Sequence, residues 1–106
     1  MLAAAIKHPG GPWRRIDIKP TVENIREFIG GHFEQVRNFN TEAIMYCNED
    51  GIRLKLVPNF YTTDQDGNNF ECIVGSVIMF GPAKNSNETD LTTELLDRTT
   101  SFLREV

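Results

Sequence analysis

Residues that bind metals or form disulfides are scarce in this sequence. It holds two cysteines, Cys47 and Cys72, and two histidines, His8 and His32, and these four do not have the spacing of a metal site. Both cysteines lie in apolar runs, so we expect buried free thiols in a reducing compartment. We therefore expect no metal and no cofactor.

Long apolar runs are also missing. No run approaches the ~20 apolar residues of a membrane-spanning helix. The apolar run Leu2–Ile6 is too short for the core of a signal peptide, and no cleavage pattern follows it. We therefore expect no contact with a membrane and a protein that stays in the cytoplasm of the cell that makes it, which is the host if a phage encodes it.

Blocks of basic residues are absent as well. The chain has 11 Lys and Arg against 15 Asp and Glu, a net charge of −4. Residues 1–40 hold six basic and four acidic groups, a net charge of +2, whereas residues 41–106 hold five and eleven, a net charge of −6. Binding to duplex phosphates by charge requires a basic block. We therefore expect no direct binding of nucleic acid, while a local pocket for a small anion stays open.

What the sequence does have is the composition of a soluble globular protein. Of its 106 residues, 40% are hydrophobic and 25% are charged, and this length corresponds to one domain. No internal repeat divides it. We expect a single α+β domain over residues 1–106.

Alternation of apolar and polar residues predicts a series of strands. Strands are expected at 2–7, 13–18, 33–39, 43–47 and 52–56, with a hairpin turn at Asn48–Gly51. The most apolar stretch, 73–80, predicts a central strand that is covered on both faces. Pro58–Tyr61 is expected to leave the sheet, and 64–69 is expected to form a polar loop.

Two helices complete the expected fold, at about 21–30 and 90–105. Thr21 and Asp90 are the expected N-caps, and Gly30-Gly31 is expected to end the first helix in a left-handed conformation. Hairpin strands with few helices indicate an α+β fold. We predict a mostly antiparallel sheet of about five to six strands, with the two helices packed on one face.

Groups that could carry out catalysis are few. The serines lack the context of a nucleophile elbow, and nothing in the sequence brings a cysteine next to a histidine. Asp64–Asn68 resembles the start of a calcium loop, but the closing glutamate is missing because Gly75 stands in its place. Gly30-Gly31 follows a helix instead of preceding one, so it does not predict a phosphate-binding loop. We therefore expect a protein that is not an enzyme.

Two aromatic segments are the best candidates for a ligand site. Trp13 can stack on a base and the arginines after it can pair with phosphate, although an exposed strand with one aromatic anchor is the simpler explanation. Phe60 and Tyr61 can also stack, or they can fill the core beneath the sheet. Asn59 can read the edge of a base. The candidate ligand-binding residues are Trp13, Arg14, Arg15, Arg53, Asn59, Phe60 and Tyr61.

Several segments together resemble a known family. They are the turn Asn48–Gly51, the pair Pro58-Asn59, the loop Asp64–Gly67, the strand Cys72–Gly81 and the segment Leu91–Glu94. Over nearly the whole chain the sequence resembles the family known as domain of unknown function 3846, which occurs in phages and bacterial mobile elements. The family usually has an arginine after the asparagine of the second segment. If that arginine contacts a ligand, this chain has lost or relocated the contact, because it has Phe60 there.

The resemblance implies an accessory protein of a phage or mobile element, and such proteins often counter host defence. We predict a non-enzymatic homo-oligomer that sequesters a small anionic ligand of nucleotide type in a pocket between subunits. The first alternative is a protein–protein inhibitor of a host defence enzyme, whose acidic surface imitates the charge of DNA. The second is a structural module without a ligand.

Overall fold

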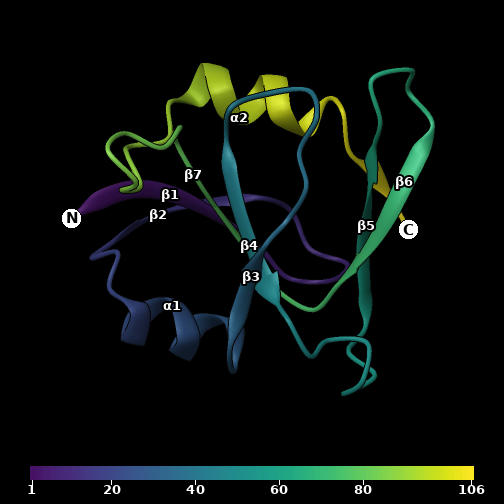
Figure 1. Cartoon of the computed structure of the whole chain (residues 1–106), viewed down its shortest axis with the longest axis horizontal. Coiled ribbons are helices and arrows are strands. Elements are labelled where there is room, and N and C mark those ends of the chain that lie inside the picture. Colours follow the sequence, from purple (N-terminus) through teal and green to yellow (C-terminus); the bar gives the residue numbers. More distant parts are fainter.

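Eight strands and two helices make up the computed structural model, which describes residues 1–106 (Figure 1). The elements are β1 (Leu2–Lys7), β2 (Arg14–Ile18), α1 (Val22–Ile29), β3 (Phe33–Gln35), β4 (Ile44–Asn48), β5 (Pro58–Thr63), β6 (Asn69–Val74), β7 (Val77–Phe80), α2 (Thr93–Thr100) and β8 (Arg104–Glu105). The strands form two antiparallel sheets, one in the order β2-β1-β7-β4-β3 and one in the order β6-β5-β8. The α+β class is confirmed, and the strands divide between two sheets.

The two helices lie on opposite faces of the five-stranded sheet (Figure 1). Successive side chains of a strand point to opposite faces, so β1 sends Ala4 toward Ile25 of α1 and Ala5 toward Leu95 of α2. The expectation that both helices share one face is therefore wrong. The face with α2 is also covered by the three-stranded sheet, through Phe60 and other core residues.

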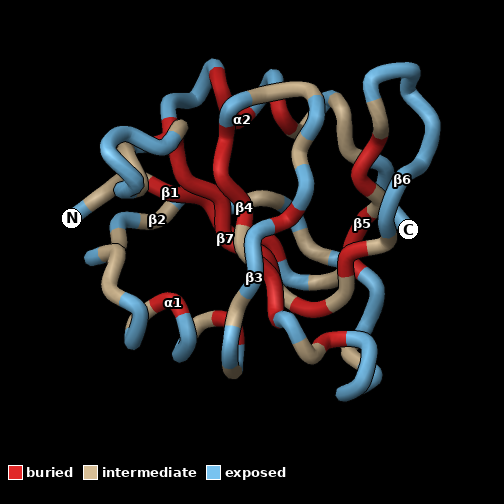
Figure 2. Tube along the Cα trace, viewed as in Figure 1, coloured by how far each residue is buried: buried red, intermediate tan, exposed pale blue.

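The central strand β7 is buried along its whole length, as the red trace in Figure 2 shows. This confirms a central strand that is covered on both faces. The predicted strand 73–80, however, is two strands in two sheets. Gly75, with φ +79°, separates them, and a Cβ at this position would come within 2.8 Å of Cδ1 of Leu56. The apolar run hides this break because both flanking segments are buried.

The segment 51–61 differs most from its prediction. Residues 52–56 form an exposed turn instead of a strand, since the N–H groups of Leu54 and Leu56 donate to the carbonyls of Asp50 and Gly51. The alternation of apolar and basic residues there reflects a solvated turn. Pro58–Tyr61 does not leave the sheet; it opens β5. Strand β3 also ends at Gln35, four residues before the predicted end.

The caps of α1 are as predicted, and those of α2 are not. Thr21 Oγ1 accepts from Asn24 N, and Gly30 has φ 88°. Helix α2 begins after Thr92 and ends at Thr100, well inside the predicted range 90–105. Asp90 accepts from Ala3 N instead of capping the helix, at 2.8 Å. Neither helix has the length and apolar surface that crossing a lipid bilayer would take.

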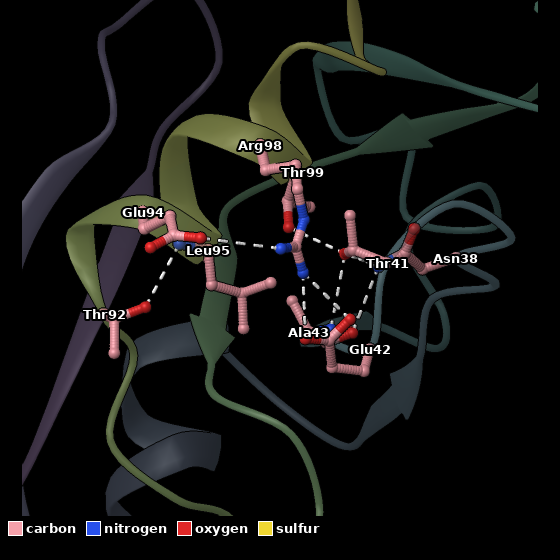
Figure 3. Close-up of polar contacts among 9 residues, drawn as sticks. All are labelled: Asn38, Thr41, Glu42, Ala43, Thr92, Glu94, Leu95, Arg98 and Thr99. Atoms are coloured by element: carbon pink, nitrogen blue, oxygen red, sulfur yellow. Dashed lines mark hydrogen bonds and ion pairs between the residues drawn. The ribbon is translucent and has the colours of Figure 1, made fainter.

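A polar cluster fixes α2 to the loop between β3 and β4 (Figure 3). Nη2 of Arg98 donates to both carboxylate oxygens of Glu42, at 2.9 and 3.1 Å. The hydroxyl of Thr41 lies 2.7 Å from that of the buried Thr99. The ion pair is exposed and screened by solvent, whereas the hydroxyl pair involves the buried Thr99.

Candidate functional site

The two aromatic segments of the predicted ligand site meet in space. The ring centroids of Trp13 and Phe60 are 5.9 Å apart. Phe60 is only 1% exposed and belongs to the core, whereas Trp13 is half-buried and packs against the same core. Phe60 therefore fills the core beneath the sheet, which is the simpler of its two interpretations, and it offers no face for stacking on a ligand.

Asn59 is a joint between the two sheets. The register of β5 shifts between Pro58 and Phe60, so Asn59 is the extra residue of a β-bulge and points inward, 1% exposed. Its Nδ2 donates to the carbonyls of Lys7 and Gly75, at 3.0 and 2.9 Å, and its Oδ1 accepts from Lys7 Nζ at 2.6 Å. With these groups engaged, Asn59 is not placed to read the edge of a ligand, contrary to its predicted role.

The remaining candidates come from β2, from the turn after β4 and from β5. Arg15 donates to the carbonyl of Leu91, so its guanidinium is engaged within the fold. Arg14 is exposed on β2, and Arg53 is exposed in the turn after β4, where it pairs with Asp50 at 3.4 Å. Tyr61 is half-buried in β5. None of the seven predicted residues lines the pocket that the structure contains.

That pocket lies at the seam between the two sheets and has a volume of about 70 Å³. One side comes from β3, β4 and the turn after β4, and the other side comes from β6. The lining residues are Glu34, Cys47, Asn48, Glu49, Gly51 and Ile52 on the first side and Glu71, Cys72, Ile73 and Val74 on the second. We call this cavity the seam pocket.

The charge of the seam pocket is of one sign. Glu34, Glu49 and Glu71 line it, no lining residue is basic, and none of the three carboxylates makes an ion pair within the chain. Burial, together with the charges of Glu34 and Glu71, raises the pKa of the Cys47 thiol to about 12. Both carboxylates therefore act on one sulfur from opposite sheets, so the negative potential is concentrated at the seam.

Cys47 should react with a disulfide reagent such as DTNB only when the chain unfolds. The thiolate is the nucleophile, and a pKa of about 12 in place of 9.0 lowers its fraction about a thousandfold at pH 8. Reaction with DTNB at pH 8 and increasing urea should show one accessible thiol, that of the half-buried Cys72, and a second thiol whose reaction follows the unfolding curve. Cys72→Ser should abolish the early phase alone. Reaction of both thiols of the wild-type chain before it unfolds would contradict the buried position of Cys47.

The same shift makes stability depend on alkaline pH. Folding raises the pKa of Cys47, so the unfolded chain ionises first as the pH rises from 9.0 toward about 12. Stability is therefore full below pH 9 and declines across that window. Urea midpoints at several pH values should fall less steeply for Cys47→Ala than for the wild-type chain.

One other pair of side chains has groups that could take part in catalysis. His8 Nδ1 and Ser76 Oγ lie 2.7 Å apart on the surface, and the ring of His8 packs on Phe28, 5.5 Å away. No carboxylate contacts this histidine, so the pair lacks the third group of a triad. No three His, Cys, Asp or Glu side chains are arranged to hold a metal ion. The carboxylates of the seam pocket offer negative charge and hydrogen-bond acceptors to a cationic group.

Sequence reasoning missed all three glutamates of the seam pocket. They lie far apart in the sequence and on separate elements, and the packing of β6 against β3 and β4 brings them together. The one available signal was the net charge of −6 of residues 41–106, which holds two of them. An excess of acid residues does not say which carboxylates converge.

The fold and the pocket define a small α+β protein of two antiparallel sheets with an acidic seam between them. The chain belongs to the family described as Domain of unknown function (DUF3846), whose model matches residues 2–104. This confirms the family predicted from the sequence motifs. Comparisons with curated proteins and with solved structures find no match. The description of the family names no activity, so the function must be argued from the pocket.

Proposed function

We propose that this chain is a non-enzymatic binding protein that holds a cationic side chain of a partner protein in the seam pocket. The observation that carries the proposal is the set of three carboxylates, Glu34, Glu49 and Glu71, that converge on one pocket without an internal cation. All three side chains are exposed, and unpaired carboxylates gathered beside a cavity favour an ammonium or guanidinium group, which can pair with them by charge and by hydrogen bonds.

The size of the pocket supports a side chain over a free nucleotide. The volume of the seam pocket is about 70 Å³. Sites for small molecules usually measure about 300–1,000 Å³. The head group of one lysine or arginine suits this space. A nucleotide is too large for it, and its phosphates would be repelled by the carboxylates.

Sequestration of a nucleotide-type ligand, the function first predicted, has less support. Its candidate residues are divided between the core and exposed or half-buried positions, and the candidates outside the core line no cavity. In the phage or mobile-element setting that the family resemblance implies, the proposed role is to block a host defence protein through its basic surface. A homo-oligomer stays a prediction, and sedimentation velocity tests it directly.

Removing two charges from the seam pocket should weaken binding to a cationic probe about tenfold. The variant is Glu34→Gln/Glu71→Gln, and the probes are argininamide and hexa-arginine at low salt, followed by NMR titration. The loss follows because each glutamine keeps the shape and removes a charge. Added salt should weaken binding of hexa-arginine to the wild-type chain steeply, because the attraction is electrostatic.

The matched control is Glu27→Gln/Asp97→Asn, which changes the net charge equally on the two helices. Both side chains are exposed and make no ion pair. The control should bind hexa-arginine as the wild-type chain does. Equal losses in both variants would mean that only overall charge matters, and the proposal would fall. A rise in melting temperature with a nucleotide, but with no cationic probe, would favour sequestration instead.

A further inference from the structure

Strand β6 combines a free edge with the seam pocket. It lies at the edge of its sheet and pairs only with β5, and no backbone hydrogen bond joins residues 69–74 to any other element (Figure 1). Four consecutive residues of its second half, 71–74, line the pocket. Its outer N–H and C=O groups make no backbone hydrogen bond, and they belong to the same strand that lines the acidic cavity.

An exposed aromatic pair lies at the other end of the same strand. Phe70 is 45% exposed and Phe39 is 41% exposed, and their rings meet edge to face with centroids 4.8 Å apart. The register of β6 shifts between Glu71 and Asn69, so Phe70 is the extra residue of a second bulge and stands out from the strand. Two phenylalanines of this exposure on neighbouring segments form an apolar platform, a common feature of a binding surface.

We infer that β6 docks an extended basic segment of the partner protein, an inference that rests on the proposed function. The segment adds a strand to the three-stranded sheet. Main-chain hydrogen bonds to β6 supply affinity, and the seam pocket takes one lysine or arginine side chain. An apolar side chain of the same segment contacts Phe39 and Phe70. The recognised pattern is a basic residue with an apolar residue two to four positions away, since a strand advances about 3.3 Å per residue.

Charge complementarity favours this occupant over a second copy of the chain. Two-fold pairing of β6 with the β6 of another copy would bring two acidic pockets into one interface, and like charges across paired strands repel. The bulge at Phe70 and the charge of Glu71 are devices by which natural edge strands avoid pairing with themselves. A basic strand does not meet the obstacle of like charge at the pocket.

The test uses three capped heptapeptides with the same alternating pattern of valine and threonine around one arginine and one phenylalanine. The second peptide is N-methylated at alternate residues, which removes the donors needed for pairing. The third carries citrulline in place of arginine, which removes the charge. NMR titration gives the affinities, and hydrogen exchange reports on the amides of residues 70–73. The first peptide should bind and slow their exchange, and each change should weaken binding about tenfold.

The outcomes separate the inference from the proposed function. If the N-methylated peptide binds as well as the first while the citrulline peptide does not, pairing with β6 is wrong and the acidic pocket stands. If citrulline and arginine bind equally, the proposed function is wrong. Absence of slowed exchange with the first peptide, or protection of β6 by dimerisation without peptide, would overturn the docking of a partner strand. Phe70→Ser should weaken the first peptide severalfold, whereas Val22→Ser, on exposed α1 surface, should not.

Discussion

Asn59→Leu should lower the free energy of unfolding by about 3–5 kcal/mol, because it removes the hydrogen-bond acceptor of a buried ammonium. Lys7 is 1% exposed, and its Nζ is held by Asn59 Oδ1 at 2.6 Å and lies 5.9 Å from the ring centroid of Phe60. Leucine leaves this ammonium with one ion pair, to Glu105 at 3.3 Å, and removes the donor that Asn59 supplies to the carbonyls of Lys7 and Gly75. Urea unfolding followed by the fluorescence of Trp13, the single tryptophan, measures the change.

Two further variants separate the buried charge from the packing. Lys7→Met/Asn59→Leu should recover part of the loss, because the ion that needs a partner is gone. Glu105→Gln should cost less than about 1 kcal/mol, since the Glu105 side chain is 69% exposed. If Asn59→Leu cost no more than Glu105→Gln, Lys7 would reach water in solution, and the joint between the sheets would be weaker than its geometry indicates.

Gly81→Ala should cost about 3 kcal/mol or more, which corresponds to a fall in Tm of roughly 12–24 °C for a domain of this size. A Cβ at this position would overlap the carbonyl oxygen of Asp90 and come within 2.8 Å of its carbonyl carbon. Backbone cannot swing away as a flexible side chain can. The Asp90 segment is also tied to β1, where Leu91 N donates to Ala3 O at 2.9 Å. Differential scanning calorimetry measures the fall.

Gly11→Ala is the matched control for this substitution. The nearest atom to a Cβ there is the carbonyl oxygen of His8 at 3.5 Å, an ordinary contact, and no left-handed conformation is needed. This variant should stay within about 0.5 kcal/mol of the wild-type chain. A comparable loss in the two variants would show that the loop after β7 can move away from Gly81, in contrast to the fixed contact described here.

The parts of the fold that were predicted correctly are those with local determinants. Helix α1 carries its own signals, a threonine at the start and a glycine at the end, and the structure uses both. β1 and β7 were recognised by runs of small or apolar residues. The turn at 52–56 was mistaken for a strand because the apolar–polar alternation of a half-exposed strand also occurs by chance in an exposed turn. Lys55, with φ 57°, has the left-handed conformation, which its residue type does not predict.

The candidate site depended on packing that the sequence does not encode locally. Asn59 and Phe60 looked like a ligand surface because Pro58–Tyr61 was expected to leave the sheet, where exposed aromatics favour binding. The segment opens β5 instead, and the bulge at Asn59 lets two consecutive residues of the strand both be buried. To predict the seam pocket, the pairing order of the eight strands would have to be known, since its glutamates come from β3, β6 and the turn after β4. The sequence shows the chemistry of each side chain, but it does not show which side chains converge in space.

Because β7 lies between β1 and β4, the five-stranded sheet cannot form during synthesis until β7 has left the ribosome. Residues 1–48 contain both hairpin partners on the two sides of the gap, β1 with β2 and β4 with β3, yet the strand that joins them is residues 77–80. Until those residues emerge, each hairpin exposes the edge and the apolar side chains that β7 will cover. The nascent chain therefore passes through a stage that is open to mispairing, and a pause in translation before residue 77 should increase its demand for chaperones.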